Sequence, residues 1–358
     1  MAYKLIQVGT GGRGGAWCGR ILPPNIEDGL IEVVAAADIN PDALGNAREH
    51  LGLREDQCYT DAAKAIEETE ADICTVVVPP WIHEEVVDLA LAKGMHILSE
   101  KPIADTLEAS VRIADKVKKA GVKMGVTMSH RFDQDKTSLR EELRSGRHGD
   151  LDYLMCRFTC DCRQFGGWGA AFRHTMIDPL MIEGAVHHLD ILADMAGSKC
   201  DTIYAQTWNP RWGSFGGDSQ GLVTMLMENG TRAFYEGAKT NAVGLNWWAQ
   251  EYIRAECEGA TLVLSRRELE RFPYNPKEMR AQGVEGEGEN IPLREQRKWA
   301  DAWLVEKFVG WLDGGEPMET NVEDNLQSVA LIFAAIESSR TGAPVKVQEF
   351  LEKARCDT

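Results

Sequence analysis

The chain has 358 residues, of which 44% are hydrophobic and 27% are charged, and its formal net charge is −17 at pH 7. This length suggests two domains, or one domain with a large elaboration, and leaves ample material for a core. The acidic balance argues against a nucleic-acid or anionic membrane surface, because binding to phosphates requires clustered lysine and arginine.

The hydropathy pattern, the first residues and the cysteines suggest the cellular compartment of the protein. No apolar stretch approaches the length of a membrane span, and the start, "MAYKLIQVGTGG", reads directly into a strand without a signal peptide. The nine cysteines are scattered, only Cys160 and Cys162 are close in sequence, and there is no C-x-x-C pair. We therefore expect a cytoplasmic protein with reduced cysteines.

The first 125 residues alternate between short apolar runs and amphipathic segments. The apolar runs predict buried strands, and the segments that follow predict helices, the first of which should end at Pro23 and Pro24. The expected strands are 3–9, 31–38, 71–80, 95–98 and 123–128, and the expected helices are 13–22, 41–52, 83–94 and 106–121. This alternation predicts βαβ units and a parallel sheet.

A glycine-rich turn follows the first strand. Gly9, Gly11 and Gly14 have G-x-G-x-x-G spacing, and Gly12 and Arg13 lie in the same turn. Between a strand and a helix, such a turn lets backbone N–H groups approach a pyrophosphate at the positive end of the helix. The alternative is a tight strand-to-helix turn that binds nothing.

Asp38 ends the second strand, 24 positions after Gly14. Its carboxylate would accept hydrogen bonds from the ribose hydroxyls of adenosine and would repel a 2′-phosphate. The next residues, Ile39 and Asn40, offer no arginine for that phosphate. The sequence therefore predicts NAD as the cofactor rather than NADP.

Two loops, "VVVPPWIH" (76–83) and "HILSEKPIAD" (96–105), follow later strands. Ligands of parallel sheets lie beyond the carboxyl ends of the strands, so both loops are expected to face the cofactor. Lys101, biased toward extended geometry by Pro102, could hold a substrate hydroxyl and stabilise the alkoxide; the alternative is a solvated Glu-Lys turn. The candidate cofactor-binding residues in these loops are Pro79, Trp81, His83, Glu100 and Lys101.

The second half has a different pattern. Alternating, β-rich runs at 151–165, 221–239 and 251–265 predict antiparallel strands, with turns at Asn229-Gly230 and Glu258-Gly259. The acidic, glycine-rich segment 276–290 predicts a surface loop, and 299–315 and 322–342 predict helices.

The segment "MIEGAVHHLDILADM", 181–195, predicts a helix on which Glu183 and His187 share a face. A carboxylate one turn before a histidine can fix its tautomer, which makes His187 a candidate general base. His188 competes for this role, about 100° around the helix. The alternatives are an exposed Glu–His pair or a structural histidine in the core. Since no H-E-x-x-H or G-x-S-x-G pattern is present, we expect neither a metal site nor a serine nucleophile.

These motifs together resemble the family of glucose-fructose oxidoreductase and myo-inositol dehydrogenase. The resemblance rests on the glycine turn, "VVVPPWIHEEVVDLALAKGMHILSEKP", "SHRFDQD", "IEGAVHHLDIL" and "SSRTGAPVKV". His187 and Asp190 match the family motif, whereas Glu183 stands where the family often has aspartate.

The resemblance implies an α/β protein with an N-terminal Rossmann domain, here 1–128, and a C-terminal α/β domain, here 129–358. The second domain would contain a large, open, mainly antiparallel sheet whose outer face makes homo-oligomer contacts. The resemblance also implies NAD(P)-dependent chemistry at a carbinol of a sugar, cyclitol or similar polyol.

Tryptophan-rich loops in the second half suggest a ring-shaped substrate. The segments 164–176 and 207–220, with Trp247 and Trp248, could stack on pyranose rings or on an aromatic aglycone. No basic cluster suggests a phosphorylated substrate. The candidate substrate-binding residues are Arg131, Arg163, Trp168, Arg173, His174 and His187.

These features predict an NAD-dependent dehydrogenase that oxidises a secondary hydroxyl of a sugar, a glycoside (at position 3 of a glucoside) or a cyclitol. His187 would take the proton, Glu183 would orient His187, and Lys101 would hold the oxygen. The only expected partners are this small molecule and further copies of the chain, with no nucleic acid or membrane. The alternatives are a redox-assisted glycosidase that retains NAD and an NAD-bound sugar sensor, which would be expected to lose the lysine and the histidine.

Overall fold

The computed structural model describes residues 2–276 and 288–358 and divides the chain into two compact units. The first unit comprises 1–129, 298–329 and 352–358, and the second comprises 130–297 and 330–351. The expected division assigned everything after residue 128 to the second domain, whereas the structure groups two later segments with the first unit. Most of the predicted surface loop at 276–290, namely residues 277–287, lies outside the described residues.

The first unit contains a six-stranded sheet in the order β3-β2-β1-β4-β5-β6, and every pair in it is parallel. The predicted parallel sheet is therefore confirmed, with the short strand β3 added at its edge. The strands are β1 (Tyr3–Val8), β2 (Ile31–Ala37), β3 (Cys58–Tyr59), β4 (Ile73–Val76), β5 (His96–Ser99) and β6 (Met124–Val126).

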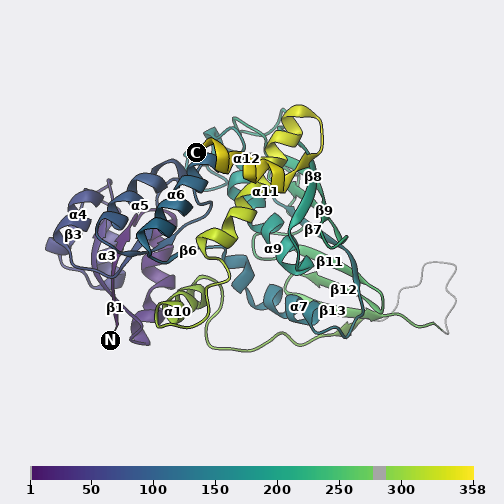
Figure 1. Cartoon of the computed structure of the whole chain (residues 1–358), viewed down its shortest axis with the longest axis horizontal. Helices are drawn as coiled ribbons and strands as arrows, with labels where there is room; N and C mark the ends of the chain where they lie inside the picture. Colours follow the sequence, from purple (N-terminus) through teal and green to yellow (C-terminus); the bar gives the residue numbers. More distant parts are fainter. Residues whose placement is uncertain (1, 277–287) are drawn as a thin grey trace. The chain divides into compact units, whose positions relative to one another are not determined.

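The connecting helices flank this sheet (Figure 1). Thr106 Oγ1 accepts the N–H of Ala109 and caps the start of α6, and Gly121 ends it in a left-handed conformation with φ 69°. The helices are α1 (Arg13–Ala16), the π-helical turn Trp17–Ile21, α2 (Pro23–Glu27), α3 (Leu44–Leu51), α4 (Ala62–Glu68), α5 (His83–Ala92), α6 (Leu107–Ala120) and α10 (Ala300–Leu312), with 3-10 turns at Glu55–Gln57 and Pro80–Ile82.

The first helical segment ends before Pro23, as expected, but a second helix begins at that proline. The helical turns of residues 13–21 lead directly into α2, which begins at Pro23. The reason is that the first turn of a helix has no partner for its backbone N–H groups, so the N–H that proline lacks is not needed there. Proline at this position starts a new helix.

The second unit contains a nine-stranded sheet in the order β14-β13-β12-β11-β7-β10-β9-β8-β15. Among the strand pairs of the described residues, only β7 and β10 run parallel, so the predicted mainly antiparallel sheet is confirmed. The strands are β7 (Leu151–Thr159), β8 (Cys200–Trp208), β9 (Gln220–Met227), β10 (Arg232–Ala238), β11 (Tyr252–Cys257), β12 (Ala260–Ser265), β13 (Glu268–Pro273), β14 (Glu289–Asn290) and β15 (Val345–Lys346).

One face of this sheet is covered by helices. α9 packs on β7 and β10, and α7 packs on α9 (Figure 1). Strand β9 alternates accordingly: Val223 and Met225 are buried, while Leu222 and Leu226 are exposed. The remaining elements are the 3-10 turn Ser129–Phe132, α7 (Gln134–Arg144), α8 (Phe172–Thr175), the π-helical turn Met181–Ala185, α9 (Val186–Ala196), α11 (Val322–Thr341) and α12 (Val347–Asp357). Among the described helices, none is both long and apolar enough to cross a membrane.

Candidate active site

The turn after β1 requires its glycines. Gly9 has φ 89°, and a Cβ atom on it would collide with the carbonyl oxygen of Val77. A Cβ atom on Gly14 would likewise collide with the carbonyl oxygen of Gly9. At Gly12, with φ 51°, an added Cβ would meet no atom within 4 Å. The turn is therefore tightly packed on its protein side and open beside Gly12, which fits the close approach of a dinucleotide pyrophosphate.

Asp38 is fixed beside this turn. Its Oδ2 accepts the backbone N–H groups of Thr10 and Gly11, at 2.8 and 2.9 Å, and its Oδ1 accepts the N–H of Asn40 at 2.9 Å. Each carboxylate oxygen can accept more than one hydrogen bond. The carboxylate thus orders the glycine turn and retains acceptor capacity for ribose hydroxyls.

Glu100 connects the loop after β5 to the first helix. Its Oε1 accepts hydrogen bonds from Arg13 Nε at 2.7 Å and from Trp17 Nε1 at 2.9 Å. Arg13 also forms an ion pair with Asp301 of α10, at 2.7 Å. Burial alone would raise the pKa of the Glu100 carboxyl, but Arg13, Lys101 and Trp17 lower it to about 2. Arg13 and Glu100 therefore hold the turn and the Lys101 loop in one arrangement.

The buried ion pair of Glu100 predicts a pH-dependent contribution to stability. Because its pKa is lowered from 4.5 to about 2, the folded state gains stability above pH 4.5 and loses it as the pH falls toward 2. Glu100→Gln should lower the free energy of unfolding at neutral pH by on the order of 3 kcal/mol. Urea denaturation measures the difference in free energy of unfolding between the wild type and Glu100→Gln. This difference should shrink as the pH falls from 4.5 to the lowest value at which both proteins fold.

Glu84 offers a matched control. The pKa of its carboxyl is also lowered to about 2, through hydrogen bonds from Arg112 and Lys116, but the pair lies nearer the surface. Glu84→Gln should cost less than about 1 kcal/mol, because solvent screens exposed ion pairs. An equal loss of unfolding free energy in both variants would contradict the larger contribution that we assign to the buried ion pair of Glu100.

His83 joins the two predicted cofactor loops. This buried imidazole lies 2.9 Å from the carbonyl oxygen of Val78 through Nε2, and 3.1 Å from those of Pro102 and Ile103 through Nδ1. Burial lowers the pKa of its imidazole. Its contacts join the loop after β4 to the loop that carries Lys101. The other candidates in these loops are half-buried Pro79 and Trp81, which is 48% exposed.

In the second unit, the predicted helix at 181–195 is not α-helical throughout. Its first turn, Met181–Ala185, is π-helical, and α9 begins at Val186. The 3.6-residue spacing assumed for Glu183 and His187 is therefore wrong in this turn, since π turns close hydrogen bonds between residues five apart. Both side chains are buried, and Glu183 Oε2 lies 3.0 Å from Arg173 Nε. Orientation of His187 by Glu183 remains a prediction.

His187 lies among aromatic rings. Its imidazole stacks on His130, with centroids 4.4 Å apart and planes at 27°, and meets Trp248 edge-on at 5.3 Å. The side chain of His187 is only 3% exposed. These two ring contacts restrict the orientation of the imidazole.

His188, the competing base, belongs to a separate hydrogen-bond network. Its Nδ1 lies 2.9 Å from the Tyr235 hydroxyl and its Nε2 lies 3.2 Å from Glu251 Oε1. Lys136 Nζ lies 2.8 Å from Glu251 Oε2. Burial lowers the pKa of His188, and no surface of its ring is exposed. These contacts give His188 a structural role, and the choice of His187 as the base remains a prediction.

The predicted substrate-binding residues order the loops that carry them. His174 Nε2 accepts the N–H groups of Gly166 and Trp168 at 3.1 and 3.2 Å. Arg163 Nε donates to two carbonyl oxygens of the 240–241 turn. Arg131 forms a bidentate, buried ion pair with Asp190, at 2.8 and 2.7 Å. Direct contact of any of these with substrate remains a prediction.

Comparison with known proteins identifies the family. A model described as the oxidoreductase family with an NAD-binding Rossmann fold matches residues 7–128. The uncharacterized protein y4oX of Sinorhizobium fredii is 54% identical over 355 residues, which span 99% of this chain and 98% of the relative. Inositol 2-dehydrogenase of Corynebacterium glutamicum is 29% identical over 233 residues, 63% of this chain and 65% of that protein. The chain belongs to the glucose-fructose oxidoreductase and inositol dehydrogenase family.

Membership makes the chain an NAD(P)-dependent oxidoreductase that acts on CH–OH groups of a small molecule. The fold matches that of a solved oxidoreductase over almost the whole chain. An oxidoreductase from Agrobacterium radiobacter, solved with NAD+, L-tartaric acid and magnesium, superposes with a TM-score of 0.84 at 19% identity. That match covers 98% of this chain and 99% of the other.

Several residues in these clusters were not predicted from the sequence. Asp301 pairs with Arg13 from almost 300 residues away, and Glu251 meets His188 from outside every recognised motif. His130 lies inside the family segment "SHRFDQD". The resemblance therefore drew attention to this segment, but His130 was not predicted as a site residue. Lys136 follows that segment directly. Nothing in the local spacing indicated Glu251 or Asp301.

Proposed function

We propose that this family member oxidises a secondary hydroxyl of a sugar, glycoside or cyclitol with NAD. The observation that carries the proposal is the place of Lys101. It follows β5 by two residues, at the carboxyl edge of the same parallel sheet that carries the glycine turn. In such sheets the ligand lies beyond that edge. Glu100 accepts the backbone N–H of Lys101, and His83 contacts the carbonyl oxygens of the next two residues, so the backbone that carries this ammonium group is fixed at that edge.

Lys101, His187 and Glu183 have separate roles in the proposed reaction. Lys101 donates a hydrogen bond to the substrate hydroxyl and stabilises the negative charge that develops on its oxygen. His187 accepts the hydroxyl proton, and Glu183, paired with Arg173, sets the orientation of that imidazole. Bound NAD supplies the acceptor for the hydride that leaves the carbinol carbon. Gly9, Gly11, Gly12, Gly14 and Asp38 would hold it.

Asp38 should determine the choice between NAD and NADP. Asp38→Ala removes the charge that repels a 2′-phosphate, so the ratio of kcat/KM for NAD to that for NADP should fall. Both values should also decline, because Asp38 orders the N–H groups of Thr10 and Gly11. Steady-state kinetics with both cofactors measure the ratio.

Asp42, an exposed carboxylate four residues later, is the control. Asp42→Ala should leave the ratio unchanged. A wild type that already prefers NADP would refute the proposed role of Asp38.

The Trp-rich loops support a glycoside oxidised at position 3. Trp168 forms edge-to-face contacts with Trp247 and with Trp248, and Trp212 and Trp247 are about half exposed. Exposed indole faces suit a pyranose ring or an aromatic aglycone. Glucosides, free sugars and inositols, each mixed with NAD and followed by NADH absorbance, test the substrate class. Release of an aglycone without net NADH would identify a redox-assisted glycosidase instead.

The exposed face of the nine-stranded sheet supports assembly into a homo-oligomer. Leu222, Leu226 and Phe234 present 36–49% of their surface there. Apolar side chains in this number on one sheet face are typical of a surface that another subunit covers.

A further inference from the structure

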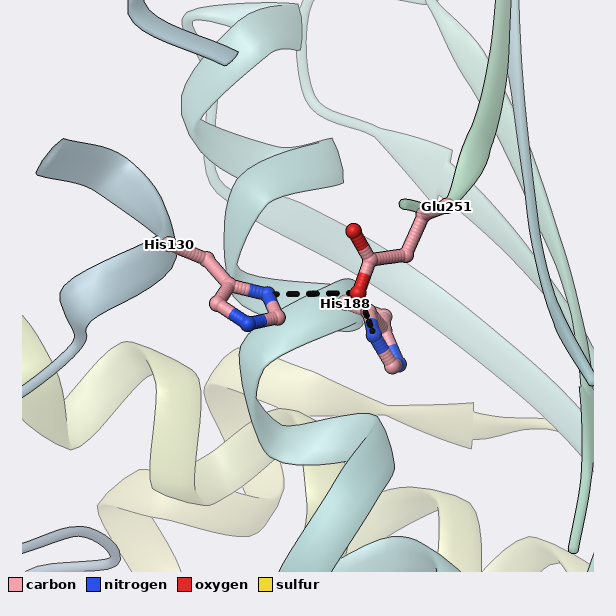
Figure 2. Close-up of side chains that lie close together, drawn as sticks. All are labelled: His130, His188 and Glu251. Atoms are coloured by element: carbon pink, nitrogen blue, oxygen red, sulfur yellow. Dashed lines mark hydrogen bonds and ion pairs between the residues drawn. The ribbon is translucent and has the colours of Figure 1, made fainter. Parts of the chain in front are cut away.

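His130, His188 and Glu251 converge inside the second unit, although they are far apart in the sequence. His130 lies in the 3-10 turn Ser129–Phe132, His188 in α9, and Glu251 directly before β11. Figure 2 shows both imidazoles turned toward one carboxylate oxygen, Glu251 Oε1. The side chains are at most 2% exposed. We call this group the His130–His188–Glu251 cluster.

The distances in the cluster suit a single bound cation. Glu251 Oε1 lies 3.2 Å from His188 Nε2 and 3.9 Å from His130 Nδ1. All three ligand atoms lie within 4.8 Å of one another. A tetrahedral ion with bonds of about 2.0–2.1 Å separates its ligand atoms by about 3.3 Å. One edge already has this length, and small side-chain rotations would bring His130 to it.

The surrounding groups support the ligands in the way that metal sites require. The Tyr235 hydroxyl lies 2.9 Å from His188 Nδ1, the nitrogen that faces away from the cluster. Lys136 Nζ binds Glu251 Oε2, the oxygen that neither histidine faces. Oε1, which also accepts the N–H of Ala249, is thus directed at both imidazoles. Metal ligands commonly have their second polar atom held by a partner of this kind.

Near the cluster, three carboxyl groups face a single lysine, which favours the binding of a divalent cation. Lys136 Nζ lies 2.8, 3.2 and 3.5 Å from oxygens of Glu251, Asp133 and Asp135, so one ammonium group serves three largely buried carboxyl groups. Buried carboxylates require compensating charge. In its absence Asp133 retains a proton more readily, since burial raises the pKa of its carboxyl to about 7. An ion of charge +2 would balance all three as carboxylates.

We propose that the His130–His188–Glu251 cluster binds one divalent transition-metal ion of the zinc class through His130 Nδ1, His188 Nε2 and Glu251 Oε1. Two imidazoles and one carboxylate favour zinc or cobalt over magnesium. Without the ion, the Tyr235 hydroxyl donates to His188 Nδ1, and His188 Nε2–H donates to Glu251. Binding moves the His188 proton from Nε2 to Nδ1 by exchange with solvent, so the imidazole stays neutral, and Nδ1–H then donates to the Tyr235 oxygen. The ion joins three elements of the second unit, independently of the proposed dehydrogenase function.

Metal content and cobalt binding test this site directly. The full-length protein is stripped with a chelator, dialysed, and titrated with Zn²⁺ or with Co²⁺, whose visible absorption reports tetrahedral coordination. We expect about one equivalent per chain and a rise in Tm when zinc is added. His130→Gln and Glu251→Gln each remove one ligand with little change in shape and should weaken binding at least about tenfold.

His148→Gln is the matched control, because His148 is another buried histidine paired with a glutamate, at 2.8 Å from Glu142. It should bind zinc like the wild type. Circular dichroism establishes that each variant is folded before it is titrated. Failure of the folded wild type to take up zinc or cobalt, or equal binding by wild type and His130→Gln, would overturn the proposal.

Discussion

Replacing His187 with alanine is expected to lower kcat by about 10²–10⁴, the range for loss of a general base. The imidazole is buried to 97%, stacked on His130 and placed edge-on to Trp248, so its orientation is restricted before substrate binds. The affinity for NAD should stay near that of the wild type, because the glycine turn belongs to the other unit. Single-turnover NADH formation and equilibrium NAD binding measure the two effects separately.

His188 provides the comparison for this experiment. It contacts Tyr235 and Glu251, so His188→Gln should lower the Tm and reduce kcat much less than His187→Ala does. Should a folded His188→Gln protein be inactive while His187→Ala turns over normally, the assignment of the base would be reversed.

Lys101→Met should lower kcat by about 10²–10³, the usual cost of removing one preorganised donor to a developing oxyanion. Methionine keeps most of the side-chain length and removes the charge. The loss should fall on hydride transfer, so deuterium at the carbinol carbon should give a larger isotope effect in the variant than in the wild type. NAD should still bind, because Asp38 and the turn around Gly9 to Gly14 are unchanged.

Lys118, an exposed lysine of α6, is a control in the same unit. Lys118→Met should have wild-type kinetics. If Lys101→Met instead lost affinity for NAD and kept its turnover at saturating NAD, the lysine would be a cofactor anchor and its proposed role would be wrong.

Local patterns were enough to predict the parallel sheet and the glycine turn of the first unit. Its strands are buried on both faces and therefore appear as continuous apolar runs, and its turn needs glycine wherever a Cβ would strike the backbone, as at Gly9 and Gly14. The second helix, which begins at Pro23, was not predicted, and the reason is also local. Proline is excluded from helix interiors and favoured at helix starts, and the sequence alone does not distinguish a helix that stops from two that adjoin.

The helix that carries Glu183 and His187 was predicted, but its geometry was not. A π-helical turn differs from an α-helical one by a single inserted residue, which the hydrophobic spacing of this segment did not indicate. The ion pair between Glu183 and Arg173 likewise joins two elements whose approach no spacing rule describes.

The sequence by itself determined the family, the parallel sheet, the dinucleotide turn and the identity of Lys101 and His187 as candidates, because each depends on residues within about one βαβ unit or one helix. Only the tertiary structure decided which residues surround them. Asp301 reaches Arg13 across almost the whole chain, and Glu251 meets His188, His130 and Lys136 inside the second unit. Such groups are brought together by sheet order and helix packing, which are non-local, so no pattern along the chain records them.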